Sequence, residues 1–227
     1  MKQEADLISA RLKTPRAAAI AGIVFSVLMI SGLLLLRISI QGNPLEADTW
    51  LKTGSGTLVR TLYMVPFAGI TFLWFIGVIR DRLGELEDQC FATVFLGSGL
   101  LFVAMLFASA AVAGGIIIAY RARPAALLES ATYSFARDLA YEIMNLYAVK
   151  MAAVFMISTS TLAIRTGIIA HWIALLGYAF AIFLLLSGRY VAWTIMVFPL
   201  WVLLVSIYIL IDNLRRPPQV TAISPET

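Results

Sequence analysis

Six long apolar runs constrain this chain more than any other feature of its sequence. Each has about 20 residues or more, the length that a helix needs to cross a bilayer. Backbone N–H and C=O groups find no water in lipid, so these runs must be helices, whose hydrogen bonds lie within the segment. We therefore predict an all-α fold, a polytopic transmembrane bundle of six helices, with spans at 17–36, 61–79, 91–120, 143–164, 168–187 and 191–211.

The composition agrees with lipid as the surrounding solvent. Of 227 residues, 61% are hydrophobic and 13% are charged, whereas soluble domains have about 45–50% apolar and about 25% charged residues. We expect one domain over residues 1–216, with the bilayer as its main partner, and a disordered tail over residues 217–227. No feature suggests a nucleic-acid partner. The single cysteine, Cys90, excludes an intrachain disulfide and a CxxC metal or redox site.

The distribution of Lys and Arg predicts the orientation. Basic residues are more numerous in the N-terminal lead (2–16), the loop around residues 80–82, the turn at Arg165 and the C-terminal tail than in the other connections. Cytoplasmic loops carry an excess of Lys and Arg, and the first helix usually has the largest influence. We therefore predict that both termini lie in the cytoplasm.

Two long connections on the outer side have the pattern of amphipathic interfacial helices. In residues 41–56, Asn43 suits an N-cap, Pro44 suits the first helical position, and Gly54 can end the helix. Residues 121–142 place apolar side chains on one helical stripe opposite charged ones. Both segments are predicted to lie on the outer membrane surface.

Lys150 is an ammonium within an apolar run, about seven residues inside its span. At about 1.5 Å per residue it lies roughly 10 Å below the outer boundary, too deep to reach water fully if it faced lipid. The candidates to surround it are Glu142, Asn145 and Tyr147. Lys150 is then a solvated residue near the rim of the bundle, a ligand-facing cation in an outward cavity, or half of an ion pair with Glu142. A cavity would tolerate Lys150→Met without loss of stability.

Two prolines lie at a depth similar to that of Lys150. Pro66 and Pro199 each remove a helix hydrogen bond and can leave carbonyl groups open to a ligand. Ordinary kinks are the preferred explanation of each proline, because prolines are common in membrane helices. Their coincidence with Lys150 is nevertheless the best indication of a ligand site, so both are candidate lining residues.

The third run carries small residues on one helical face: Gly97, Ala104, Ala108, Ala111 and Gly115. Membrane helices approach closely over such faces. We expect this face to pack against another helix of the chain, with a dimer contact as the alternative. A polar block at 158–161 is expected to bond to carbonyls of its own helix, and a polar path through the membrane is the alternative.

The groups that most cofactors and metals require are missing from the spans. The single histidine, His171, stands beside Trp172 at a span end and suits an interfacial position. Without a second histidine or a thiolate pair, the sequence supports neither a bis-histidine haem nor a zinc site. No carboxylate lies deep in a span and no serine has a histidine at its depth. We therefore predict no metal, no cofactor and no catalytic residue.

The stretch "ISTSTLAIRTGIIAHWIALLGYAFA" (157–181) resembles the fourth and fifth helices of small bacterial six-span membrane proteins of unknown function. In those proteins a short "RTG…W…LLG" turn joins the two helices. The resemblance covers about a tenth of the chain. It implies a multi-pass protein of the bacterial inner membrane and supplies no catalytic residue.

Three classes of function remain open. The first is a non-enzymatic accessory or structural membrane component that packs against other membrane proteins or against copies of itself. The second is a small transporter or channel with an outward cavity around Lys150. The third is a membrane enzyme that acts on outer-leaflet lipid through Asp138, Glu142 and nearby arginines. The first is preferred narrowly, because the spans hold few charges.

Overall fold

The structure is a computed structural model that describes residues 2–39, 49–83, 89–167, 169–187 and 194–215. Within these ranges every regular element is a helix, so the prediction of a helical membrane bundle is confirmed. Asn43, Pro44 and the tail at 217–227, for which a cap and disorder were predicted, lie outside the described residues.

The helices follow one another with short connections. In chain order they are α1 (Lys2–Ser39), α2 (Thr49–Leu83), α3 (Gln89–Ala122), α4 (Pro124–Leu128), α5 (Ala131–Glu142), the π-helix η2 (Ile143–Ala148), α6 (Val149–Thr166), α7 (His171–Leu186) and α8 (Thr194–Arg215).

Five apolar segments in the described part are long enough to cross a membrane, against the six predicted. They are Ala17–Leu36, Gly56–Arg80, Ala92–Ala122, Ala131–Thr166 and Thr194–Arg215. The helix in the fifth predicted run, α7, has 16 residues and reaches only about 24 Å. It is therefore shorter than the hydrocarbon thickness of about 30 Å.

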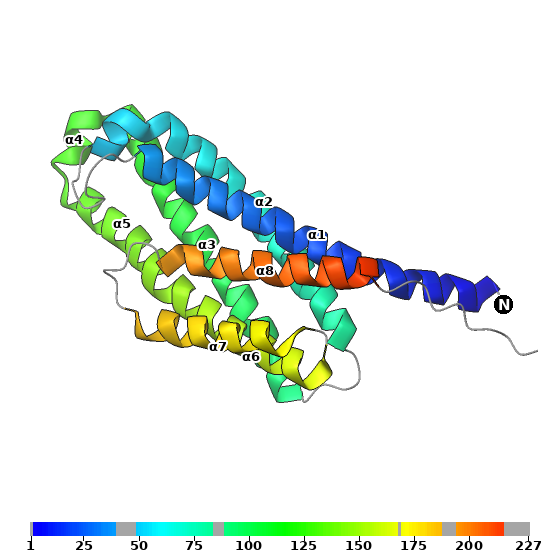
Figure 1. Cartoon of the computed structure of the whole chain (residues 1–227). Coiled ribbons are helices and arrows are strands. Elements are labelled where there is room, and N and C mark those ends of the chain that lie inside the picture. Colours follow the sequence, from blue (N-terminus) through cyan, green and yellow to red (C-terminus); the bar gives the residue numbers. More distant parts are fainter. Residues whose placement is uncertain (1, 40–48, 84–88, 168, 188–193, 216–227) are drawn as a thin grey trace, which may run out of the picture.

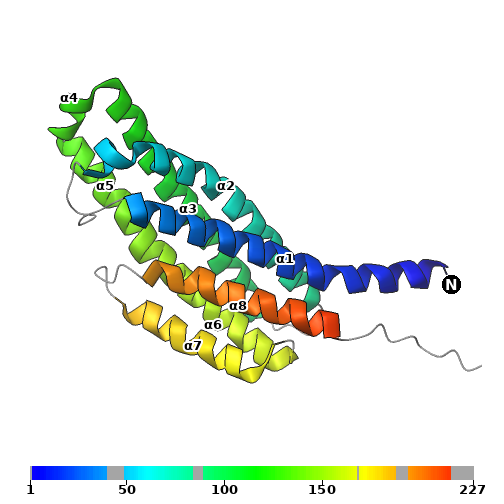
Figure 2. The same cartoon turned by 45° about the horizontal axis from the view of Figure 1, so that its top comes forward.

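The long helices lie side by side in one bundle (Figure 1). α1 packs along α2 and along α8, α2 packs on α3, and α3 packs on α6, which is paired with α7. Figures 1 and 2 both show the start of α1, the end of α8 and the α6–α7 turn at one end of the bundle, with α4 at the other. The described ends of the first and last helices therefore lie on the same side.

The tight turn predicted between the fourth and fifth runs is present. α6 ends at Thr166, and Gly167 follows in the left-handed conformation with φ of 66°. Its N–H donates to the carbonyl of Ala163 at 3.0 Å, which satisfies one of the carbonyls left open at a helix end. Glycine suits this position because it adopts positive φ without steric cost.

The two predicted surface helices are not separate helices of the kind expected. Gly54 does not end a helix, because it lies inside α2. The segment 121–142 contains α4 and then α5, whose N-cap Ser130 accepts a hydrogen bond from the N–H of Thr132. α5 continues through η2 into α6 without a break, so residues 131–166 form one long helical segment (Figure 1).

The centre of the bundle is a cluster of seven phenylalanine rings from α1, α2, α3, α6 and α8: Phe25, Phe72, Phe75, Phe95, Phe102, Phe155 and Phe198. Phe72 is fully buried and contacts five of the other rings, with centroid distances from 4.6 Å to Phe25 up to 6.0 Å to Phe75. In lipid, where apolar side chains gain little by leaving the solvent, such packing contacts hold helices together.

Glycines mark the places where helices approach most closely. A Cβ on Gly22 of α1 would overlap Ser206 Oγ of α8. A Cβ on Gly177 of α7 would overlap Ser160 Oγ of α6 and lie 2.9 Å from Trp201 Nε1 of α8. These contacts require the absence of a side chain, as expected where membrane helices touch through their backbones.

The small-residue face predicted on the third run does not make such contacts within the described chain. Gly97 and Gly115 have no atom within 4 Å of a Cβ position. Ala104 and Ala111 are exposed, and Ala108 is only half-buried. The expectation that this face packs inside the chain is therefore wrong. Because α3 is apolar all round, spacing groups these residues on one face but does not say which way that face points.

The two kinds of glycine should respond differently to the same substitution. Gly177→Ala should lower the free energy of unfolding by about 1–3 kcal/mol, because the added methyl group overpacks a close contact. Gly97→Ala should leave it equal or raise it by up to about 1 kcal/mol through better helix propensity. Unfolding in mixed micelles, followed by circular dichroism, measures both. Equal losses in the two variants would contradict the assigned contacts.

Candidate functional site

Lys150 of α6 binds the end of α7. Its Nζ donates hydrogen bonds to three backbone carbonyl oxygens: Leu184 at 2.8 Å, Leu185 at 2.6 Å and Ser187 at 2.9 Å. An ammonium group has three N–H donors, and here each has an acceptor. The Ser187 hydroxyl also donates to the carbonyl of Leu184 at 2.9 Å. The lysine is therefore a capping group for a neighbouring helix.

The short length of α7 explains why it needs this cap. The last carbonyl groups of a helix have no partner in their own helix, and in hydrocarbon each unsatisfied group costs several kcal/mol. α7 has 16 residues, about 24 Å, so a span of this length would leave some of its end groups inside a hydrocarbon layer of about 30 Å. A positive charge there also interacts favourably with the negative end of the helix dipole.

This arrangement differs from each interpretation of Lys150 made from the sequence. Lys150 is half-buried, and its side chain turns toward α7. All three of its hydrogen bonds go to α7, so the structure does not pair it with Glu142 or direct its donors into a cavity. The expectation that Lys150→Met would be tolerated must therefore be reversed.

The other candidate residues do not gather around Lys150. Asn145 Nδ2 donates to the carbonyl of Tyr141 at 3.0 Å, within its own helix. Tyr147 is 57% exposed and points away from the bundle. Pro66 is exposed on α2, whereas Pro199 is buried in α8. The two prolines face opposite environments, so the coincidence in depth does not make a shared site.

The polar block of α6 behaves mainly as expected. Ser158 donates to the carbonyl of Val154 at 3.0 Å and Thr159 to that of Phe155 at 2.7 Å. Thr161 donates to the carbonyl of Ile157 at 2.9 Å, and its oxygen lies 2.7 Å from the Tyr178 hydroxyl of α7. These hydroxyls bond back to their own helix or across to α7, which supports helix packing rather than a polar path.

The described residues contain no group of three or more His, Cys, Asp or Glu side chains placed to hold a metal ion. His171 is exposed at the start of α7 beside Trp172, which is 59% exposed. Both residues therefore have the exposure expected of an interfacial pair.

Sequence reasoning missed the partner of Lys150. Its acceptors lie 34 to 37 residues further along the chain and are backbone atoms, so no residue type marks them. The available signal was the pair of helix-end residues, because Gly167 precedes the run that contains α7 and Ser187 is its last residue. A lysine at matching depth on the preceding helix was the second part of that signal.

Comparison of the chain with protein-family models, curated protein sequences and solved structures gives no match.

Lys150→Met should destabilise the fold. The three carbonyl groups lose a charged donor, and we expect a loss of about 2–4 kcal/mol in the free energy of unfolding in micelles. Amide hydrogen exchange should also become faster in the last turn of α7. Glu142→Gln should change the free energy of unfolding by the same amount in the wild-type and Lys150→Met backgrounds, because the effects of substitutions at independent sites are additive. If the losses in unfolding free energy of the two substitutions were strongly non-additive, Lys150 would be paired with Glu142 rather than acting as a cap.

Proposed function

We propose that this chain is a non-enzymatic accessory component of the bacterial inner membrane, which packs against other membrane proteins or copies of itself. In this proposal it crosses the membrane six times, with α7 as a short fifth span and both termini in the cytoplasm. The start of α1 and the end of α8 lie at the same end of the bundle, as an even number of crossings requires (Figures 1 and 2).

The observation that carries the proposal is the commitment of Lys150 to α7. A charged residue inside a span is a functional candidate by default, and the transporter alternative depended on this one. Its three donors are already used by the carbonyls of Leu184, Leu185 and Ser187. The most prominent intramembrane charge therefore supports a structural role, which favours the accessory component over the transporter.

The enzyme alternative gains no support from its candidate residues. Asp138 accepts hydrogen bonds from Arg137 Nε at 3.1 Å and Nη2 at 3.0 Å. The Arg137 guanidinium also lies 6.0 Å from the centroid of the Tyr133 ring, which is buried. These contacts are typical of a structured surface segment and leave that carboxylate paired with its sequence neighbour.

The proposed orientation can be tested by thiol labelling in intact cells. Glu129→Cys should react with a membrane-impermeant maleimide, because Glu129 is exposed between α4 and α5 on the proposed outer side. Ser130 is less suitable, because its hydroxyl caps α5. Native Cys90 should react only after the membrane is permeabilised. Labelling of Cys90 but not of position 129 in intact cells would reverse the orientation.

An accessory role predicts protein contacts on the lipid-facing surface. A photoreactive amino acid is placed on three exposed faces, at Trp74 of α2, Ala104 of α3 and Ile182 of α7. At least one position should form a discrete adduct with a second polypeptide in native membranes, first at Ala104, where small residues permit the closest approach. Mass spectrometry then separates a second copy from a different protein. Lipid adducts alone at all three positions would contradict the proposal.

A further inference from the structure

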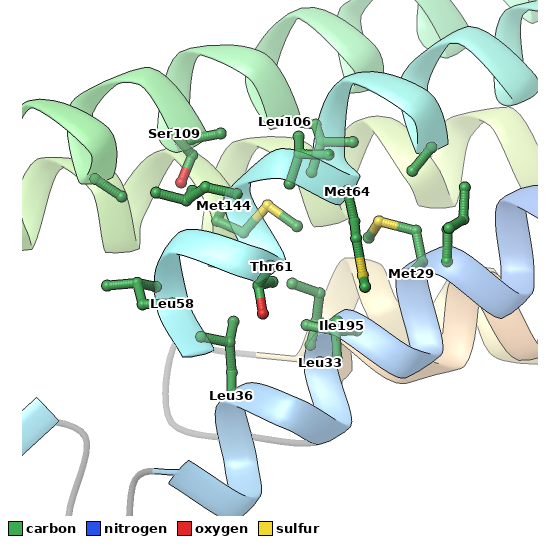
Figure 3. A pocket seen from close by; sticks show the side chains of 17 residues that line it. Met29, Leu33, Leu36, Leu58, Thr61, Met64, Leu106, Ser109, Met144 and Ile195 are labelled. Atoms are coloured by element: carbon green, nitrogen blue, oxygen red, sulfur yellow. The ribbon is translucent and has the colours of Figure 1, made fainter. Parts of the chain in front are cut away.

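A cavity of about 150 Å³ lies between α1, α2 and α3, beside η2 and the start of α8. Its lining is almost wholly apolar. Met29, Met64 and Met144 converge on it from three different helices, as Figure 3 shows. Methionine is flexible and polarisable and fits irregular apolar partners, and it is over-used at surfaces that accept varied ligands.

The residues that line the cavity extend along three helices. Its lining extends over residues 28–36 of α1, 58–68 of α2 and 106–113 of α3. At about 1.5 Å per residue these stretches are roughly 10–15 Å long. They follow the helix axes, which is the direction that lipid chains take in a bilayer.

The volume suits one hydrocarbon chain. Pockets for drug-sized molecules are about 300–1,000 Å³, so this cavity is too small for a whole lipid with its headgroup. Apolar cavities of about 150 Å³ stay free of water and accept small apolar ligands. A segment of an alkyl chain fits both the shape and the lining.

One polar group in the cavity lacks a partner. Thr61 is only 6% exposed, and its Oγ1 has no hydrogen-bond partner among the described residues. Its methyl group packs where Gly32 of α1 has no side chain, 3.1 Å from the Cβ position. In Figure 3 the hydroxyl oxygen lies on the side of Leu33 and Leu36. A buried hydroxyl without a partner is costly.

The other hydroxyl in the lining is already satisfied. Ser109 donates to the carbonyl of Ala140 at 2.8 Å. Thr61 therefore supplies the free donor. It lies one turn from Leu58, near the end of the cavity at which the apolar part of α2 begins at Gly56, and the lining deeper along α2 is apolar. A matching ligand has a hydrogen-bond acceptor near the membrane boundary and a hydrocarbon chain beneath it.

We propose that this cavity binds one acyl chain of a membrane lipid, and that the Thr61 hydroxyl donates a hydrogen bond to the ester carbonyl of that chain. The ester provides the acceptor, the chain provides the apolar length, and the headgroup stays outside. This site is distinct from Lys150, and it does not depend on the proposed accessory role.

The purified full chain is reconstituted into vesicles of phosphatidylethanolamine and phosphatidylglycerol that contain a trace of phospholipid with a diazirine in one acyl chain. After illumination, adducts are mapped to peptides. In the wild type they should concentrate on the peptides that contain Met29, Met64 and Met144. An ester-free alkyl diazirine serves as the comparison probe, because it can fill the cavity but cannot accept the hydrogen bond.

Two matched substitutions on α3 test the site. Ala113→Phe fills the cavity and should abolish labelling of these peptides, whereas Ala104→Phe, on the exposed face, should leave it unchanged. Thr61→Val has nearly the same shape and should lower labelling by the ester probe about twofold to tenfold, the factor for one hydrogen bond. It should not lower labelling by the alkyl probe.

Each result decides part of the proposal. Adducts spread over the exposed faces, or wild-type labelling in Ala113→Phe, would overturn the cavity as a lipid site. Equal labelling of Thr61→Val and the wild type by the ester probe would overturn the role of the hydroxyl. Because Thr61→Val adds no volume, it keeps the test valid if Ala113→Phe fails to fold.

Discussion

A carbonyl group that ends a helix inside hydrocarbon needs a hydrogen-bond donor, and this requirement shapes one side of the bundle. α7 has only 16 residues, and Lys150 of α6 supplies hydrogen-bond donors to the carbonyls at its end. The left-handed Gly167 closes the other end of the same helix pair. A charge that looks out of place in the sequence therefore caps the end of a short neighbouring helix.

Packing contacts hold the other helices of the bundle together. Lipid is as apolar as the helices, so their arrangement depends on shape rather than on removal of apolar surface from water. The phenylalanine cluster around Phe72 joins five helices, and Gly22 and Gly177 allow close contacts at α8. The cavity at Thr61 is where this packing is incomplete, which is why a molecule from the bilayer could occupy it.

The sequence predicted the helical membrane bundle well, because long apolar runs have few alternatives in lipid. It also predicted the turn at Gly167 and the hydroxyl bonds within α6. The sequence did not predict which way particular helix faces point. The small face of α3 points outward, and Pro66 and Pro199 point to opposite environments, because a helix that is apolar all round gives no sign of its inner face. The acceptors of Lys150 and the cavity were hidden because both depend on contacts between distant segments.

The π-helix at 143–148 has a consequence for the rotation of α5 relative to α6. Its wider turn holds more residues than an α-helical turn, and each residue in a helix corresponds to about 100° of rotation. A chain with one residue fewer here would form a regular α-helix, and the residues before the deletion would then present a different face. An alignment gap between helices α5 and α6 would therefore belong inside this segment and not in a loop. Met144, which lines the cavity from η2, would be among the first residues to change neighbours.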